Sequence, residues 1–412
     1  MTNRSAGALT SADLGARVRM IRRRRGLGLE VVAGLAGISK SYLSRLESGH
    51  RQFDRRGLIE DLASALGCSI ADITGAPMAS SHDDHEQTHD ALAEIRAVLH
   101  TYDTDDLPDV TPRPLSKLVH TVDAANEDCA QAQYHRAARE AATLVAESQA
   151  QLWTSSAADR RTAVRAAVLA CFVAGVVTSR GGNIDLAAAA ARRGHDLAQR
   201  GGDPGLAGFA RWYWSLELTS TAARTRATTV LTEGITELSP TVRWSNTDTL
   251  TAEMTGLLHL QLARTAARQG DGEQAHLHLD EADRIAAHTG EQDGMRQHFG
   301  PSNAAAWRLS TGIELGEGPR VYDEVMRAGL DVTALGSRER ASSIHFDLTR
   351  ALTQHDRTRD AEAVRHLDAA DRIAPQRLRP DPLARELIAQ LTRRAARPSW
   401  ELTSLARRFG LR

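Results

Sequence analysis

The stretch GLGLEVVAGLAGISKSYLSRLESG, residues 26–49, decides the fold at the N-terminal end of this 412-residue chain. Its apolar residues have the spacing of two short amphipathic helices, which we expect at about 29–36 and 39–47. Gly37 lies between them, where a tight turn needs a backbone that glycine adopts without strain. Ser39 is a typical N-cap for the second helix, and Gly49 is a typical C-terminal stop. The stretch therefore predicts two helices joined by a tight turn.

The flanking segments complete one small domain. Upstream, Leu14, Val18 and Ile21 recur at helical spacing and give an apolar stripe that packs a helix on this pair. Downstream, Leu58 and Leu62 begin a similar stripe in another helix, and a fifth short helix follows near residues 70–73. We expect these five helices to enclose a common core.

Two runs, SYLSRLESG at 41–49 within this stretch and LASALG at 62–67, allow the pattern to be compared with a known family. The chain from about 14 to 73 resembles the Cro/C1-type (XRE) family of helix-turn-helix regulators. The resemblance implies a five-helix lambda-repressor-like domain that binds a double-stranded DNA operator as a homodimer. It also implies that Arg22 and Glu47 form an ion pair between the first helix and the recognition helix. The polar face of that recognition helix, at the implied base-contact positions, carries Lys40, Ser41, Ser44 and Arg45.

The chemistry of these side chains suits the major groove, where each base pair presents a distinct pattern of donors and acceptors. Arg45 can donate two parallel hydrogen bonds to guanine. Residues 1–75 hold twelve basic and seven acidic residues, a formal charge of +5, whereas the whole chain is −1. We expect contacts to DNA phosphates from Arg19, Arg23, Arg51, Arg55 and Arg56. Such contacts position the protein on the duplex but do not specify the base sequence. The competing interpretation is a solvated arginine surface, since only two of the chain's 51 basic residues are lysines.

Composition excludes several classes of protein. Three widely spaced cysteines give neither a disulfide framework nor a zinc pattern, which suits a reducing cytoplasm. We find no signal peptide, and the longest apolar run, 166–179, is too short for a membrane span of roughly 20 residues. Because no phosphate-binding loop, nucleophile elbow or metalloprotease motif occurs, we expect no enzymatic activity and no cofactor.

Residues 77–114 have the composition of a linker that contains one helix, at about 86–102. Within it, His82, His85 and His89 share a helical face among acidic residues. Such imidazoles could bind a metal ion, but we favour a polar, solvated helix start, because nothing downstream supplies a second shell of ligands, and we expect no metal. We therefore divide the chain into a DNA-binding domain (1–76), this linker (77–114) and a repeat domain (115–412).

The repeat domain contains an internal echo. The segment HLDEADRIA at 278–286 recurs as HLDAADRIA at 366–374, with one difference and a spacing of two units of about 44 residues. This period indicates a helical solenoid, in which small residues let paired helices approach closely. The segment from about 115 to 395 resembles tetratricopeptide (TPR) arrays, and the tail is expected to form capping helices at 383–395 and 399–409. The sequence thus predicts an all-α fold, a five-helix domain followed by a TPR-like α-solenoid.

The resemblance implies a concave groove, and the combination of an XRE head with TPR helices resembles regulators that bind a signalling peptide there. Aromatic and amide side chains concentrate at a few places in the array and are our candidates for the groove, although each could instead be a packing or capping residue. They are Arg211, Trp212, Trp214, Asn246, His298, Asn303 and Trp307. We expect a cytoplasmic, sequence-specific transcriptional regulator whose repeat domain binds an effector peptide or small molecule and mediates dimerisation. The alternative is a DNA-binding scaffold whose groove recruits a partner protein.

Overall fold

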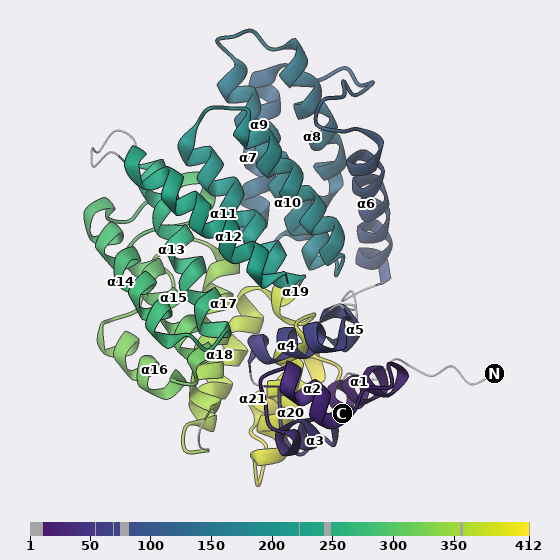
Figure 1. Ribbon diagram of the computed structural model, residues 1–412, viewed down its shortest axis with the longest axis vertical. Coiled ribbons are helices and arrows are strands. Elements are labelled where there is room, and N and C mark those ends of the chain that lie inside the picture. The colour runs from purple at the N-terminus through teal and green to yellow at the C-terminus, as the bar shows by residue number, and fades with distance from the viewer. Residues whose placement is uncertain are drawn as a thin grey trace, which may run out of the picture.

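The computed structural model describes residues 11–411 with the exception of 54, 69, 75–81, 222, 243–248, 355 and 356. Within these residues the regular elements are twenty-one α helices and two short 3-10 helices, without a β strand. The expected all-α fold is therefore confirmed. Figure 1 shows a small group of helices, the head (residues 11–74), seated against a much larger curved array (residues 82–411).

The head contains five helices around one apolar core. They are α1 (Ser11–Arg24), α2 (Leu29–Leu35), α3 (Lys40–Glu47), α4 (Arg56–Leu66) and α5 (Ile70–Thr74). Of the predicted stripe residues, Leu14, Val18, Leu62 and Leu66 are buried, and Ile21 is half-buried. Phe53 adds a fully buried ring between α3 and α4. The burial of these side chains supplies the main stabilisation of such a small domain.

The turn between α2 and α3 has the predicted backbone. Gly37 has φ of 65°, in the left-handed region that other residues enter only with strain. Ser39 then caps α3, because its hydroxyl accepts a hydrogen bond from the Tyr42 amide at 3.2 Å. Gly49 follows the helix with φ of 73°. These three residues fix the direction in which α3 leaves the turn.

The array is a series of antiparallel helix pairs. Its helices are α6 (His82–Thr101), α7 (Leu115–Ala130), α8 (Tyr134–Thr154), α9 (Arg160–Arg180), α10 (Ile184–Gln199), α11 (Pro204–Ser220), α12 (Arg224–Leu238), η1 (Ser239–Thr241), α13 (Leu250–Arg268), α14 (Gly272–Thr289), η2 (Gly294–Arg296), α15 (Pro301–Leu315), α16 (Gly318–Arg327), α17 (Arg338–Thr353), α18 (Asp360–Ile373), α19 (Pro375–Leu378), α20 (Pro382–Arg394) and α21 (Trp400–Arg408). Six consecutive pairs run from α7/α8 to α17/α18, and the first helix of each pair packs on the first helix of the next.

The linker helix and the most apolar helix both belong to the packed array. The linker helix, α6, lies against α8, and its Ile95 is fully buried in the main core, so this segment is not a free connection. The helix α9 is long and apolar enough to cross a membrane by composition, but 78% of its most apolar window is buried by its neighbours. We therefore interpret α9 as a buried core helix of the array.

The repeated sequence segments lie on equivalent helices, α14 and α18, two pairs apart. In both, the histidine that begins the repeated segment contacts a histidine on the first helix of the same pair. The Nδ1 atoms are 3.0 Å apart for His259 and His278, and 3.0 Å apart for His345 and His366. The repeated sequence segment therefore corresponds to a packing contact that occurs twice in the fold.

The array closes on itself, which the sequence did not predict. The Ser337 hydroxyl donates a hydrogen bond to the Ala130 carbonyl at 2.9 Å, and the Gln131 amide donates to the Gly336 carbonyl at 2.9 Å. Arg180, at the end of α9, pairs with Glu339 of α17 at 2.7 Å. The first two pairs are thereby joined to the sixth, and the expected open groove becomes the interior of a ring.

Candidate DNA-binding surface and effector cavity

The outer face of α3 presents its polar side chains to solvent. Lys40, Ser41, Ser44 and Arg45 are all exposed. Lys40 lies 3.3 Å from the exposed Glu30 carboxylate, and Arg45 donates from Nε to the Ser41 carbonyl at 3.3 Å. Arg45 forms no ion pair with any of the described residues. Its guanidinium group is therefore available to a duplex.

The inner side of α3 is fixed by a buried ion pair with α1. Arg22 donates from Nε to Glu47 Oε1 at 2.5 Å and from Nη2 to Oε2 at 2.7 Å. The third nitrogen of Arg22 donates to the Leu27 carbonyl at 2.9 Å. Hydrogen bonding to Glu47 raises the pKa of Arg22. This bidentate geometry orients α3 relative to α1 and keeps the Glu47 carboxylate away from the exposed face.

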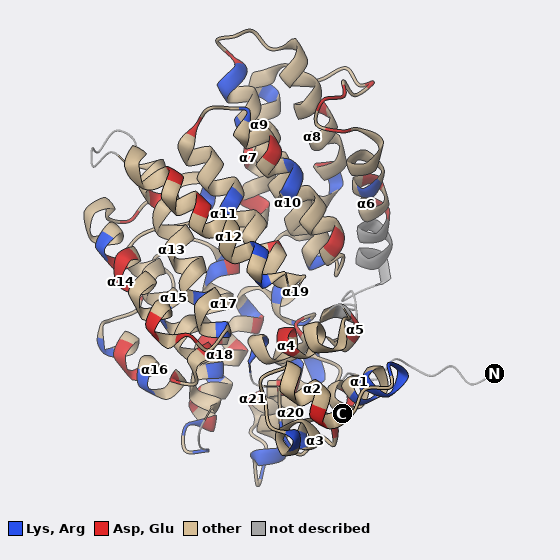
Figure 2. Ribbon diagram, viewed as in Figure 1, with Lys and Arg blue, Asp and Glu red and all other residues tan. Residues whose placement is uncertain are grey.

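Four of the five arginines expected at phosphates lie on the head surface. Arg19, Arg23, Arg51 and Arg55 are exposed, and Arg51 stacks over the Tyr42 ring at 5.4 Å. Figure 2 shows basic residues along α1 and on α3, at the end of the molecule far from most of the array. Arg56, in contrast to the prediction, lies apart from these four. It pairs with Asp381 at 2.6 Å where the head meets the array, so it is not available to phosphates.

The head is held to the array by α4, on the side opposite α3 (Figure 1). Arg224 of α12 pairs with Glu60 and Asp61 and donates to the Gly57 carbonyl at 2.8 Å. Arg268, the last residue of α13, pairs with Glu60 at 2.7 Å. A Cβ atom at Gly57 would lie only 3.3 Å from the Arg268 carbonyl oxygen, so glycine permits this close approach. The docking leaves the recognition face of α3 uncovered.

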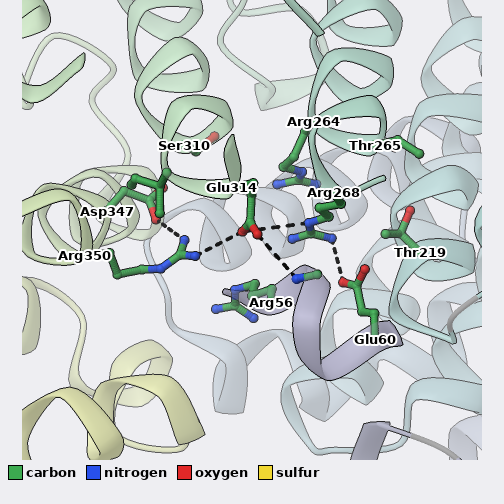
Figure 3. Close-up of polar contacts among 12 residues, drawn as sticks. Arg56, Glu60, Thr219, Arg264, Thr265, Arg268, Ser310, Glu314, Asp347 and Arg350 are labelled. Atoms are coloured by element: carbon green, nitrogen blue, oxygen red, sulfur yellow. Dashed lines mark hydrogen bonds and ion pairs between the residues drawn. The ribbon is translucent and has the colours of Figure 1, made fainter. Parts of the chain in front are cut away.

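These contacts continue into a buried network of alternating charges inside the ring (Figure 3). Glu314 of α15 lies between Arg350, at 3.0 Å, and Arg268, at 3.9 Å, and it also accepts from the Gly57 amide at 3.4 Å. Burial alone would raise the pKa of Glu314, but Arg350 and Arg268 lower it to about 2. For Glu60 the balance is reversed, because burial raises its pKa more than the flanking arginines lower it. The network therefore joins head and array through desolvated ion pairs.

A cavity of about 450 Å³ lies next to this network. Its walls come from both parts of the chain. The head contributes Arg56, Ile59, Glu60, Ile70 and Thr74, and the array contributes residues of its first helices together with others from the η2 segment, α19 and α20. The volume is in the range of small-molecule sites, roughly 300–1,000 Å³. Residues of the head and of the array therefore line the same space.

The cavity contains four of the seven residues that the sequence suggested for a groove: Trp212, His298, Asn303 and Trp307. Asn303 is buried, donates to the carbonyls of Gln297 and His298, and accepts from Arg340 Nε at 2.8 Å. The His298 Nδ1 atom lies 2.8 Å from an Asp293 oxygen.

Two of the suggested residues lie elsewhere. Arg211 pairs with Glu237 at 2.7 Å, and Trp214 stacks on His195 at 4.8 Å, outside the cavity. Successive residues of α11 point in different directions, so a cluster that is contiguous in sequence divides between separate faces. Asn246 lies outside the described residues.

The histidine cluster that was considered as a metal site also lies outside the described side chains. His82, His85 and His89 fall in the first turns of α6, where the backbone alone is described. Among the side chains that are described, no group of three or more histidine, cysteine, aspartate or glutamate residues is arranged to hold a metal ion.

Sequence reasoning missed most of the charged cavity wall, which includes Arg180, Glu217, Arg264, Arg268, Glu314, Glu339, Arg340, Asp347, Arg350 and Arg377. These residues come from α9, α11, α13, α15, α17 and α19. One feature of the sequence could have predicted part of this charged wall, because arginines occupy the last turns of α9, α13 and α17. Repeated arginines at the ends of first helices are expected to meet wherever those ends converge.

Comparisons with known proteins support the assignment of the head. The Helix-turn-helix domain family matches residues 13–74. An uncharacterized HTH-type transcriptional regulator, y4mF, of Sinorhizobium fredii is 36% identical over 61 residues, which is 15% of this chain and 79% of that protein. The competence pilus inhibition repressor of Acinetobacter baylyi is also 36% identical over 61 residues, and the match spans about half, 54%, of its length.

Two solved structures have a weaker likeness to the whole chain. The structure of Bacillus thuringiensis PlcR in complex with the peptide PapR7 and DNA is 12% identical, with a TM-score of 0.28, over 67% of this chain and 95% of that one. The apo form of the competence regulator ComR from Streptococcus vestibularis is 11% identical, with a TM-score of 0.22, over 87% and 98%. Scores at this level do not establish a common arrangement of the helices.

Proposed function

Since this chain belongs to the helix-turn-helix transcriptional regulators, we propose that it reads a specific operator and that an effector in the ring cavity changes its affinity for DNA. One observation carries the second half of this proposal. The cavity is walled by head and array together, and both Glu60 of the head and its partner Arg268 line it, so an occupant can contact both sides of this ion pair. A ligand shifts a conformational equilibrium only through such differential contacts.

In the DNA-bound state, α3 lies in the major groove and the four exposed polar residues of its outer face meet the base edges. Arg19, Arg23, Arg51 and Arg55 contact phosphates. Two copies of the chain bind two half-sites about 34 Å apart, as is usual for such heads. We place this activity in the cytoplasm, where genomic DNA is accessible to the chain.

The effector is a peptide of a few residues or a small molecule of similar size, because the cavity holds about 450 Å³. The scaffold alternative needs an open groove that admits part of another protein. Contacts between α7 and α17 close the ring, which favours the effector. The effector acts by changing how firmly α4 is held, and thus the spacing and orientation of the two heads on DNA.

The first test selects binding sites from a random duplex library with the full chain and measures their affinity by fluorescence anisotropy. The measurement is repeated with fractionated extracts of the producing culture. We expect a strong sequence preference and a fraction that changes both DNA affinity and melting temperature. The absence of sequence preference would refute the reading of DNA by α3. A copurifying protein that changes neither quantity, with no active fraction, would favour the scaffold.

The second test weakens the docking of the head. Arg224→Gln removes the ion pairs to Glu60 and Asp61 and the hydrogen bond to the Gly57 carbonyl. We expect this variant to retain its DNA sequence preference but to respond less to the active fraction. Arg226→Gln is the matched control, because Arg226 is exposed on the same helix and contacts Trp214 instead. Equal responses in the two variants would mean that docking does not transmit the signal.

A further inference from the structure

Two arginines of the cavity differ from the others because they lie against an aromatic ring and have no carboxylate partner. The guanidinium carbon of Arg264 is 4.5 Å from the centre of the Trp307 ring, and that of Arg340 is 5.6 Å from it. Arg264 donates from Nη2 to Gln261 Oε1 at 2.6 Å, and Arg340 donates from Nε to Asn303 Oδ1 at 2.8 Å. These acceptors are neutral amide oxygens. In the described part of the chain, neither arginine forms an ion pair.

The remaining arginines around the cavity are largely neutralised. Arg180 pairs with Glu339, Arg268 with Glu60, and Arg350 with Glu314 and Asp347. Arg264 and Arg340 are thus left as excess positive charge in a partly desolvated space, an arrangement that is costly without a counter-ion. Burial, together with the charges of Arg268 and Arg340, lowers the pKa of Arg264 to about 9. The Nε atom of Arg264 is buried without a hydrogen-bond partner.

From this geometry we propose that Arg264 and Arg340, on either helix flanking Trp307, form an anion-binding site for the carboxylate or phosphate of the effector. The inference rests on the proposed function, and it specifies the chemical class of the ligand. The planar guanidinium fork matches both anions and can donate two parallel hydrogen bonds. Apolar side chains line other parts of the same cavity, including Phe172, Leu216 and Leu257. The effector is therefore an amphiphile with one anionic group and an apolar body.

The site also connects to the docking of the head. Arg264 and Arg268 are one turn apart on α13 and lie beside each other in Figure 3. Arg268 is the residue that pairs with Glu60 of the head. An anion bound at Arg264 compensates the positive charge next to Arg268 and so alters the strength of its pair with Glu60. This provides a short electrostatic path from the ligand to α4.

The test uses the full chain and three small probes: phenylacetate, its neutral counterpart phenylacetamide, and phenyl phosphate. Binding is measured by calorimetry and thermal shift at constant ionic strength in a chloride buffer. We expect saturable stabilisation by at least one anion and none by the amide, with the two anions distinguishing a carboxylate from a phosphate ligand. Failure of both anions, or equal binding of the amide, would overturn the proposal.

Variants locate the binding. Arg264→Gln and Arg340→Gln should each raise the dissociation constant of the anion by at least about tenfold, the effect of losing one charge-assisted contact. Arg226→Gln, which removes an arginine from the Trp214 ring outside the cavity, should change nothing. Unchanged affinity in both cavity variants would place the anion elsewhere and refute the site.

A measurement on the unmodified chain avoids any dependence on the folding of variants. Phenylglyoxal labels accessible arginines, and mass spectrometry reports each position. The bound anion should slow labelling of Arg264 and Arg340 but not of Arg226, and equal rates with and without the anion would contradict the site. The DNA assay separates this inference from the proposed function. Anion binding without any effect on DNA affinity refutes the function alone, whereas an active fraction whose effect persists in Arg264→Gln and Arg340→Gln refutes the anion site alone.

Discussion

The head surface and the ring interior are both rich in arginine, but the two regions use it differently. On the head, Arg45 is exposed and has no ion-pair partner among the described residues. Inside the ring, Arg268 and Arg350 are almost fully buried and flank the same carboxylate, Glu314. Hydration stabilises the charge of the exposed arginine, whereas the buried arginines are stable only with their counter-ions. The same side chain therefore supports recognition at one place and structure at the other.

The largest effect should follow from removing the shared counter-ion. Glu314→Ala leaves two buried guanidinium groups without it, and we expect a loss of about 3–5 kcal/mol in the free energy of unfolding. The free energy of unfolding of the wild type should also fall in acid, because protonation of Glu314 removes the same counter-ion. The folded pKa of Glu314 is lowered from 4.5 to about 2, so its contribution is present above its unfolded pKa near 4.5 and is lost as pH falls towards 2.

Urea denaturation at several pH values measures both effects. Glu317→Ala is the control, because Glu317 is three residues away and pairs with Arg320 at a more exposed position. A stability loss in Glu314→Ala no larger than in the control would show that the buried charges do not depend on this carboxylate.

A smaller effect is expected on the head. Arg45→Ala should reduce the preference for the selected operator over other sequences by about 1–3 kcal/mol, the value of one bidentate base contact. The melting temperature should hardly change, since the Arg45 side chain is exposed. Anisotropy titrations with the operator and with substituted duplexes measure this. An unchanged preference would remove α3 from the DNA interface.

The smallest effect distinguishes two arginines that the sequence treats alike. Arg51→Gln should reduce the slope of log affinity against log salt by about 0.9, the value of one phosphate contact. Arg56→Gln should leave the slope unchanged, because Arg56 pairs with Asp381 at the junction with the array. The comparison needs only salt titrations on one duplex. A reduced slope in Arg56→Gln would mean that the head leaves the array when it binds DNA.

The sequence was a good guide wherever the relevant contacts are local. The turn at Gly37, the cap at Ser39 and the burial of Leu14 and Val18 follow from spacing within one or two helices. The echo at 278 and 366 likewise located equivalent helices, since a repeated contact requires repeated residues. Local periodicity is the strongest signal that a single sequence contains.

The cavity could be predicted only in part, because its geometry depends on how six helix pairs curve. Trp212 and Trp214 are two residues apart on α11, yet only Trp212 lines the cavity. Arg264 and Arg340 lie 76 positions apart in the sequence, and no local pattern relates them. The pairing of Arg56 at the junction with the array could not be predicted for the same reason, since its partner Asp381 is 325 residues away.

The contacts between α7 and α17 also bear on how this chain unfolds and on how its number of helix pairs can change in evolution. An open solenoid behaves as a row of nearest neighbours, so it can fray from either end and can gain or lose one unit at little cost. Here the hydrogen bonds from Gln131 and Ser337 couple the first pair to the sixth. Denaturation of the array should therefore proceed as a single cooperative event. Insertion or deletion of one pair would break the circle, which fixes the number of pairs.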